Sequence, residues 1–424
     1  MSDQNGQAIT DKAVFDLVQS DFNIVKKKIY LNNGSISPLP ISTIKSITDF
    51  CLRYSETGPD SSDFNTYLDN LKKEVRKRVA DLIKSSTEEI IFTQSTTEGI
   101  NFISNGLKWK KNDRILIRNS RNEHFSNYLP WLKAVLDFKL GLGLFPSNDK
   151  ESTGSALAKD FEDIYSQNHY KLISTSHIMY NNGSITPVEY LGKVINESHN
   201  NTLFSIDGAQ SVGAIDVNVK NINCDFMTFP SFKWICGPLG IGLLFVKKNV
   251  MDELNPVFVG SGSAEVIKLD TKKFGKDEQL EIHESFRFNK YPEKYHSSFR
   301  NFPGLAGLEA SLRYLMRIGI KNIEARNKVL SSILRDDLSK LSELVIHEAD
   351  EENYRSALIS FSFKKKNDEK VKKLNFRLQE QGIILAEREI GKRKILRASP
   401  HFYNSEDEIQ KTCETIKFQI RNNI

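Results

Sequence analysis

The chain has 424 residues, 39% of them hydrophobic and 10% aromatic, which is enough to fill the cores of two or three domains and excludes a fibrous or disordered protein. Its 59 basic and 54 acidic residues leave a net charge of only +5, spread along the chain, so nucleic-acid binding has no support. The four cysteines are far apart and form no C-x-x-C pair, which argues against a zinc site or a disulfide framework. We expect no metal site.

The amino terminus lacks a basic stretch followed by an apolar run, and no apolar run approaches the ~20 residues that span a bilayer. We therefore predict a cytoplasmic protein with no membrane partner. Residues 1–29 are expected to form a segment that packs with a small carboxyl-terminal domain. Residues 30–303 are expected to form a large domain.

Short apolar runs rich in β-formers alternate with helical stretches between about residues 85 and 250. This alternation predicts an α/β domain, with a mainly parallel sheet covered by helices. The expected strands are, in chain order, EIIFT, DRILIR, KLISTS, NTLFSID, CDFMTF and GIGLLFV. Because ligands bind at the carboxyl ends of parallel strands, the chemistry should lie in the turns that follow them.

The last part of the chain breaks this rhythm. The stretch from Pro256 to Asn301 is rich first in Gly and Ser and then in charged and aromatic residues, which predicts a loop-rich connector. From Gly304 a long helical pattern leads to the strands SALISFSF, GIILAE and KILRAS, with one helix after the first strand and another at the end. Residues 304–424 are therefore expected to form a smaller α+β domain.

Two of the turns carry candidate chemical groups. Asp207 ends the strand NTLFSID and Gln210 follows it, although a carboxylate there is also an ordinary turn residue. Lys233 lies between Phe232 and Trp234, after an apolar strand and before a glycine-rich turn. Such a lysine either extends to water or is partly desolvated, and a desolvated amine has the lowered pKa that imine chemistry needs.

The two motifs, D-x-x-Q and then S-x-K-W-x-x-G-P-x-G-I-G, resemble the class V aminotransferase family of pyridoxal phosphate (PLP) enzymes, which includes cysteine desulfurases and isopenicillin N epimerase. The resemblance extends from about Tyr30 to the carboxyl terminus. It implies a PLP cofactor and a seven-stranded, mainly parallel sheet of the aspartate aminotransferase (PLP fold type I) architecture. It also implies a homodimer, with a partner loop around residues 286–301 near the active site.

The resemblance assigns catalytic roles around the cofactor ring. Lys233 would hold the cofactor as an imine, and its freed amine would move protons at Cα. Asp207 would pair with the pyridine nitrogen, and Gln210 would hydrogen-bond the phenolic oxygen. The segment RNEHFSNYLPW resembles the family's E-H-x-x-N-x-x-P-W, in which the histidine stacks on the ring. This match assigns His124, because a histidine without such a match is more often a surface residue or a hydrogen-bonded core residue.

The phosphate is expected near IFTQSTTEGIN, which resembles the family's T-T-E-x-I-N. Thr96 and Thr97 would bind it at a helix start expected at Glu98, because free N–H groups and the helix dipole favour an anion there. A plain Thr N-cap is the structural alternative. Ser231, the first residue of the lysine motif, is assigned to the cofactor as well.

The substrate is expected to be a small α-amino acid. In LRASPHFYNSEDEI, which resembles the family's R-x-S-x-x-x-Y-N-x-x-x-E-I, Arg397 would bind the α-carboxylate, a bidentate contact suited to a planar guanidinium. Asn33 and Gly34 belong to IYLNNGSISPLP, which resembles the loop on the substrate side of the pocket.

The chain departs from the family pattern at the sulfur-carrying residue. Cysteine desulfurases have a persulfide cysteine just before the carboxylate-binding arginine, whereas GIILAEREIGKRKILRAS contains none. Cys236 is nearest to Lys233 in sequence, and packing is its simpler role. A persulfide-carrying desulfurase is therefore disfavoured, while C–S cleavage by elimination remains open.

Other departures concern the surroundings of the cofactor. Phe232 replaces a histidine that contacts the phosphate in relatives, and Tyr180, with Asn181 beside it, stands where relatives often have asparagine near the phenolic oxygen. The Gly-Thr element that reaches the partner subunit's phosphate aligns with Ser298-Phe299. Its role would then fall to Ser297, Ser298 or Arg300.

We predict an enzyme that acts at Cα of an α-amino acid, in the first place an aminotransferase. The alternatives are a C–S lyase or desulfurase-like enzyme without a persulfide cysteine, an isopenicillin N epimerase-like epimerase, and a non-catalytic binding protein. A non-catalytic relative would usually have lost Lys233, Asp207 or Arg397, all of which are present. The reactions share imine exchange and loss of the Cα proton, so the motifs do not choose among them.

Overall fold

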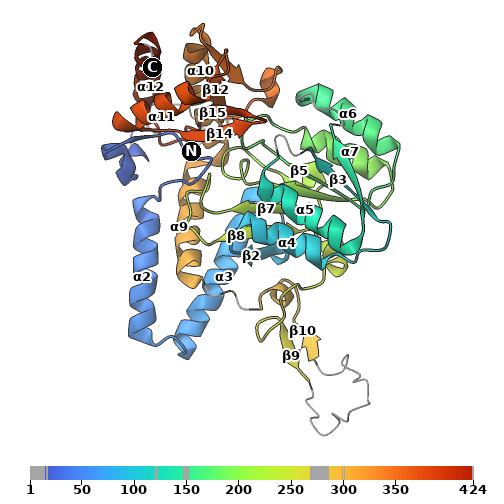
Figure 1. Ribbon diagram of the computed structural model, residues 1–424. Coiled ribbons are helices and arrows are strands. Elements are labelled where there is room, and N and C mark those ends of the chain that lie inside the picture. The colour runs from blue at the N-terminus through green and yellow to red at the C-terminus, as the bar shows by residue number, and fades with distance from the viewer. Residues whose placement is uncertain are drawn as a thin grey trace, which may run out of the picture.

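A seven-stranded sheet forms the centre of the computed structural model, which describes Phe15 and residues 18–119, 123–146, 152–267, 286–297, 299 and 301–422. Its strand order is β2-β8-β7-β6-β5-β3-β4 (Figure 1). The strands are β2 (Ile90–Thr93), β3 (Arg114–Arg118), β4 (Gly141–Phe145), β5 (Leu172–Ser176), β6 (Leu203–Asp207), β7 (Phe226–Pro230) and β8 (Gly242–Val246). Only the pairs that include β8 are antiparallel, so the predicted mainly parallel α/β sheet is confirmed.

The edge strand β4 was missed in the sequence. Its residues, GLGLF, include two glycines, which weaken the strand signal because glycine has no side chain to pack. Close packing explains the glycine at position 143, because a Cβ there would lie only 2.7 Å from the hydroxyl oxygen of Tyr170. β4 is therefore a strand because of its neighbours and not because of its own composition.

Helices cover both faces of this sheet. On one face α4 (Thr96–Gly106) and α5 (Phe125–Phe138) share an apolar core with alternate strand residues. On the other face α3 (Ser62–Ile83), α6 (Gly154–Ser166), α7 (Val188–Glu197) and α9 (Phe302–Ile318) contribute to a second core, and α2 (Ile41–Thr57) packs on α9. The short α8 (Val219–Ile222) precedes β7. Burial on both faces explains why the strands are almost continuously apolar.

The carboxyl-terminal part contains a four-stranded antiparallel sheet in the order β11-β12-β15-β14. Its elements are β11 (Leu344–His347), β12 (Ile359–Phe363), β14 (Ala386–Ile390), β15 (Arg393–Ala398), α10 (Ile320–Ser339), α11 (Asp368–Glu380) and α12 (Glu406–Arg421). The expected single strand GIILAE is wrong in detail. Its first half is β13 (Ile383–Ile384), which pairs with β1 (Ile29–Tyr30), and β14 begins only at Ala386.

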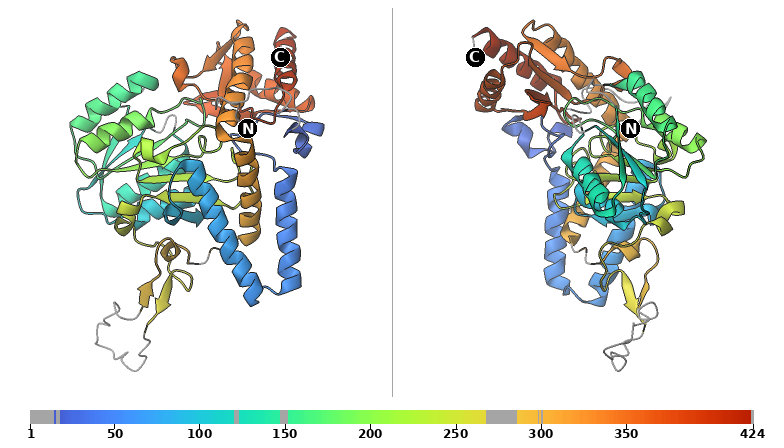
Figure 2. Two further views of the ribbon diagram at one scale, coloured as in Figure 1. Left: turned by 180° about the vertical axis from the view of Figure 1, so that it is seen from behind. Right: turned by 45° about the vertical axis from the view of Figure 1, so that its right-hand side comes forward.

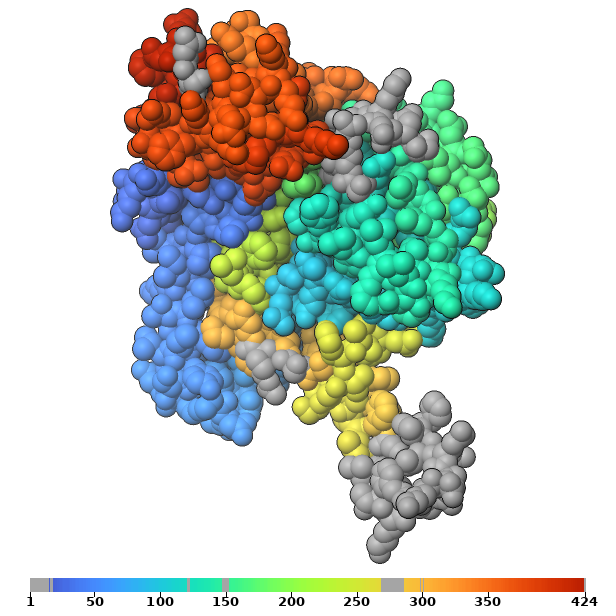
Figure 3. Space-filling model, in the orientation of Figure 1, coloured from blue at the N-terminus to red at the C-terminus, as the bar shows by residue number. Residues whose placement is uncertain are grey.

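The amino-terminal segment packs against the carboxyl-terminal part, as Figure 3 also shows. Besides the β1–β13 pairing, the ring of Phe22 stacks on Tyr403 with centroids 4.3 Å apart. The helix α9 packs on α2 and α3, beside the large sheet. The division of the chain at residues 29 and 303 stays a prediction.

The connector contains more structure than expected. β9 (Ala264–Val266) and β10 (Phe286–Phe288) pair antiparallel and project from the body (Figure 2). The 3-10 helices within the described residues are η1 (Asn23–Lys26), η2 (Thr87–Glu89), η3 (Lys248–Glu253), η6 (Glu293–Tyr295) and η7 (Glu352–Tyr354). Within the described ranges, no helix has the length and apolar character needed to cross a membrane.

Candidate active site

A cavity of about 320 Å³ opens where β2, β5, β6 and β7 end. The predicted residues that line it are Gly34, Thr96, Thr97, His124, Tyr180, Asp207, Gln210, Lys233 and Arg397. These side chains come from segments up to 363 positions apart, Gly34 to Arg397, and the sheet places them around one space. The turns after the parallel strands therefore form one site, as expected for this topology.

The half-buried Lys233 and the buried Asp207 form the centre of the site. Asp207 ends β6, is 5% exposed and accepts a hydrogen bond from the amide of Ala209 at 2.8 Å. Burial raises the pKa of Asp207, an effect that the charge of Lys233 opposes. Burial also lowers the pKa of Lys233 to about 8, against the opposing effect of Asp207. The lysine is therefore the desolvated amine that the sequence allowed as one of two alternatives.

His124 presents a neutral imidazole to the cavity. It is the N-cap of α5, where its Nδ1 accepts a hydrogen bond from the amide of Ser126 at 3.1 Å, so the proton lies on Nε2. Burial, followed by nearby cationic groups, lowers its pKa to about 4. The ring of Tyr180 meets it edge-on, with centroids 4.8 Å apart, whereas Asn181 is buried and does not line the cavity.

The start of α4 forms one end of the cavity. The helix begins at Thr96 and not at Glu98, and its N-cap is Ser95, whose hydroxyl accepts from the amide of Glu98 at 3.1 Å. The alternative of a Thr N-cap is therefore wrong. The hydroxyl of Thr96 is buried without a hydrogen-bond partner among the described residues. The first turn also offers N–H groups without intrahelical partners, so an anion fits here.

Arg397 lies at the other end of the cavity, on β15, and is 1% exposed. It donates to the carbonyl of Tyr180 at 2.6 Å and to the hydroxyl of Ser35 at 2.8 Å, while its Nε has no partner among the described residues. Burial, and then the charge of Arg388, lower its pKa to about 9. A Cβ on Gly34 would lie 3.1 Å from Nη2, so the glycine leaves room for the guanidinium.

Gln210 lines the cavity with a side chain that is already engaged. Its Nε2 donates to the carbonyl of Gly34 at 2.8 Å, and its Oε1 accepts from the indole of Trp234 at 2.9 Å. One N–H of the amide remains for another acceptor, such as a phenolic oxygen.

Two predicted residues do not line the cavity. Ser231 is fully buried and donates to the carbonyl of Pro238. Asn33 is also fully buried, donating to the carbonyl of Ser399 at 2.8 Å and accepting from the hydroxyl of Tyr403 at 2.8 Å. Both side chains hold neighbouring loops in place, which explains why they face the protein and not the cavity.

Sequence reasoning missed two groups at the site. Arg388, on β14, lines the cavity and donates to the hydroxyl of Ser35, which it shares with Arg397. Glu123 is 2% exposed and accepts from the amides of His124 and Ser176, each at 2.9 Å. Burial, and then the charge of Asp207, raise its pKa to about 7. Arg388 could have been noticed in the sequence, because it is an arginine in the middle of the strand AEREI.

None of the four cysteines lines the cavity. Cys236 is fully buried, and burial raises the pKa of its thiol to about 12. Cys224 and Cys413 are also buried, and Cys51 is exposed on α2. No cysteine is therefore placed to take sulfur from a substrate bound between Lys233 and Arg397.

This sheet, with a partly desolvated lysine and a buried carboxylate at its strand ends, defines a PLP-dependent enzyme of fold type I. The chain belongs to the class V aminotransferase family, because it matches the family described as "Aminotransferase class-V" over residues 29–412. The predicted family, fold type and PLP cofactor are thereby confirmed.

Similar proteins carry names from sulfur chemistry. A probable cysteine desulfurase of Methanothermobacter thermautotrophicus is 27% identical over 94% of this chain and 96% of its own length. One of Pyrococcus abyssi is 30% identical over 76% of each chain. The apo structure of a cysteine desulfurase from Thermococcus onnurineus has a TM-score of 0.84 at 27% identity, covering 98% of this chain and all of that one. The cystine C–S lyase C-DES, at 23% identity, shares the fold with a TM-score of 0.80, covering 93% of this chain and 98% of that one.

The residues present fit PLP. The helix start with its unpartnered Thr96 hydroxyl suits a phosphate, and the buried carboxylate of Asp207 suits a cationic ring nitrogen. Lys233 supplies an amine that is partly neutral at physiological pH. Phe232, which also lines the cavity, adds no hydrogen bond to the phosphate end.

Proposed function

We propose that the protein is a PLP-dependent C–S lyase that cleaves the Cβ–S bond of a sulfur-containing α-amino acid and releases the sulfur without a protein cysteine. The lining of the cavity carries this proposal: it combines Lys233, Asp207 and Arg397, and it contains no cysteine. The relatives named as probable cysteine desulfurases support C–S chemistry over the aminotransferase that the sequence suggested first.

The site residues divide the work of this reaction. PLP supplies the electron sink for the electrons released when a bond to Cα breaks. Asp207 would hold the positive charge at the ring nitrogen, and Thr96 and Thr97 would hold the phosphate. His124 would lie against the ring as a neutral imidazole. The amine of Lys233, with its lowered pKa, takes the proton from Cα.

The reaction balances with water as the one co-reactant and without an oxidant, and the proton taken from Cα by Lys233 goes to the departing sulfur. Loss of the Cα proton is followed by breakage of the Cβ–S bond, and the sulfur leaves with the bonding electron pair. Hydrolysis of the released aminoacrylate gives pyruvate and ammonium. The sulfur product is a thiol, sulfide or persulfide, depending on the group attached to the sulfur.

The two guanidinium groups favour a substrate with two carboxylates. Arg388 and Arg397 share the hydroxyl of Ser35, and neither forms an ion pair with a carboxylate of the described residues. Each half-buried or buried guanidinium gains most from a charged partner. Cystine places one carboxylate at Cα and a second beyond the disulfide, so it is the substrate that we propose.

The holoenzyme tests this function directly. Incubation with L-cystine should give pyruvate, ammonium and a persulfide in equal amounts, and Lys233→Ala should abolish both turnover and the borohydride-resistant attachment of the cofactor. Arg388→Ala should raise KM for cystine about 10- to 100-fold and leave KM for a monocarboxylate S-alkylcysteine nearly unchanged. The exposed Arg377→Ala is the matched control. Arg397→Ala should raise both KM values.

Products other than pyruvate, ammonium and a persulfide would indicate a different reaction. A keto acid formed without release of sulfur would indicate transamination, and exchange of stereochemistry alone would indicate epimerisation. If no amino acid of a full panel is turned over, the protein would be a non-catalytic binding protein. Any of these results would overturn the lyase proposal.

We also propose a homodimer that closes the site. Ile36 lines the cavity and is 45% exposed, and Phe125, next to His124, is 64% exposed. Such apolar side chains beside a cavity suit a second copy. Of the residues expected at the partner's phosphate, Ser298 and Arg300 lie outside the described residues and Ser297 is half-buried. Sedimentation of the holoenzyme at the mass of two chains is the expected result.

A further inference from the structure

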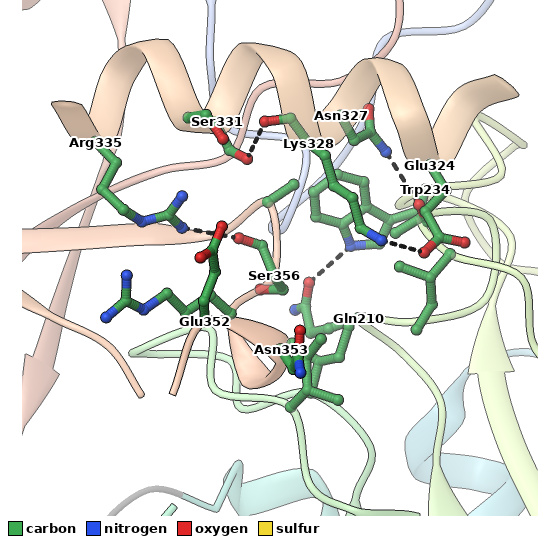
Figure 4. A pocket seen from close by; sticks show the side chains of 17 residues that line it. Gln210, Trp234, Glu324, Asn327, Lys328, Ser331, Arg335, Glu352, Asn353 and Ser356 are labelled. Carbon is green, nitrogen blue, oxygen red and sulfur yellow. Dashed lines mark hydrogen bonds and ion pairs between the residues drawn. The ribbon is translucent and has the colours of Figure 1, made fainter. Parts of the chain in front are cut away.

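A second cavity, of about 290 Å³, lies between α10, the segment at residues 352–357 and loops of the large sheet (Figure 4). Its wall shares Ile178 and Gln210 with the active-site cavity, but the rest of its lining is different. The volume lies near the lower end of the roughly 300–1,000 Å³ typical of small-molecule sites. The space therefore suits a small ligand that is separate from the substrate.

One part of this cavity is apolar. Trp234, Ile178 and Ala214 belong to a small buried cluster, with Ile185 and Ile215 packed against it. Trp234 is only 1% exposed and its N–H is engaged by Gln210, so the apolar surface open to a ligand comes chiefly from the half-buried Ile185, Ile215 and Ala357. A branched aliphatic side chain would fit against these residues.

The other end of this cavity is charged. Its two arginine side chains share one carboxylate, and a further carboxylate there forms no ion pair within the described part of the chain. Arg335 and Arg355 both pair with the same carboxylate, Glu348, with Nε–Oε distances of 2.5 and 3.4 Å. Two guanidinium groups against one carboxylate leave a positive surplus. Glu352, an exposed residue, lines the same end near Arg335 in Figure 4, and its carboxylate forms no ion pair with the described residues. Lys328 is paired with Glu324 at 3.0 Å and is not needed for charge balance.

We infer that this cavity binds a free α-amino acid with an apolar side chain. The carboxylate would contact Arg335 and Arg355, the ammonium group would contact Glu352, and the side chain would pack on Ile185 and Ile215. A zwitterion satisfies both unbalanced charges at once, whereas a simple anion or cation leaves one of them unpaired.

The site is connected to the cofactor through Gln210. Its Oε1 accepts from Trp234 at 2.9 Å, and its Nε2 donates to the carbonyl of Gly34 on the substrate side. Trp234 is also the residue that follows Lys233. A ligand in this cavity would lie against Gln210, which lines both cavities, so we expect its binding to alter the surroundings of the active site.

Calorimetry on the holoenzyme after borohydride reduction tests the inference, because the cofactor is then fixed on Lys233 and no turnover occurs. L-leucine is the probe, with 4-methylpentanoate and 3-methylbutylamine as analogues that each lack one charge. Leucine should bind at one site, and each analogue should bind with an affinity at least about tenfold lower than that of leucine. The test does not depend on which reaction the enzyme catalyses, so a failure here is distinct from a failure of the lyase proposal.

Two variants locate the binding. Glu352→Gln should weaken leucine about tenfold and leave 4-methylpentanoate unchanged, whereas Glu414→Gln, an exposed change on α12, should affect neither. Ala357→Phe should fill the cavity and abolish binding. Failure of leucine to bind, or binding that is insensitive to Glu352→Gln, would overturn the site. If leucine binds but the fluorescence of the reduced cofactor does not change, the proposed connection between this cavity and the active site through Gln210 is wrong.

Discussion

Lys233 has its low pKa because of its position in the fold. Its amine lies among Asp207, Arg388 and Arg397, and burial is the largest influence on it. The sequence offered two alternatives for this lysine, extension to water or desolvation, and the apolar neighbours at 232 and 234 allowed both. The packing of the surrounding loops selects desolvation.

The attachment of PLP to the apoprotein should therefore depend on pH. Only the neutral amine attacks the cofactor aldehyde, so the rate should rise about tenfold per pH unit below a pKa of about 8 and level off above it. Stopped-flow absorbance on the apoprotein measures this rate. In Asp207→Asn the midpoint should move to lower pH, because the carboxylate that raises the lysine pKa is gone. A midpoint near the ordinary 10.5 would mean that Lys233 is solvated.

Asp207→Asn should also reduce kcat/KM at least about 100-fold, or roughly 2.7 kcal/mol, since a neutral amide cannot hold a positive charge at the ring nitrogen. Turnover of the proposed substrate and the absorption spectrum of the bound cofactor measure this. Asp163→Asn, an exposed change on α6, is the control and should leave both unaltered. Equal losses in the two variants would argue against a specific role for Asp207.

At the scale of elements, the phosphate end depends on how closely β8 approaches the start of α4. A Cβ on Gly242, the first residue of β8, would lie 2.6 Å from backbone atoms of Ser95, the N-cap of α4. Backbone atoms cannot move aside as a flexible side chain can. The glycine thus allows the strand to approach the loop that precedes Thr96.

Gly242→Ala should displace this loop, lowering the free energy of unfolding by about 1–3 kcal/mol and weakening PLP binding to the apoprotein. Urea unfolding and PLP titration measure the two effects. Gly260→Ala is the matched control, because the nearest atom to its Cβ would lie at an ordinary 3.4 Å. Unchanged PLP affinity in Gly242→Ala would show that the phosphate binds elsewhere.

At the scale of the whole molecule, the amino-terminal segment connects to the carboxyl-terminal part through Phe22. This ring is fully buried, stacks on Tyr403 and contacts Tyr314 and Phe402 edge-on. Tyr314 belongs to α9, which packs on the large body, so the cluster ties together parts that are distant in sequence.

Phe22→Ala should therefore reduce the free energy of unfolding by about 3–5 kcal/mol, as expected for truncation of a large core ring. Chemical denaturation followed by circular dichroism measures this. Phe418→Ala removes the same ring from a position that is 63% exposed and should change stability by less than about 0.5 kcal/mol. Similar losses in both variants would contradict a special role for the amino-terminal segment.

The sequence by itself determined the α/β class, the six apolar strands and the family with its PLP cofactor, because strand periodicity and the D-x-x-Q and S-x-K-W motifs are local patterns. It missed β4, whose glycines carry little strand signal and whose place is set by β3. Only the tertiary structure decided that Arg388 joins Arg397, that Ser231 and Asn33 face away from the cavity, and that Lys233 is desolvated. Those outcomes depend on burial and on contacts that exist only in the folded chain, such as those of the Ser35 hydroxyl with Arg388 and Arg397, which no local pattern contains.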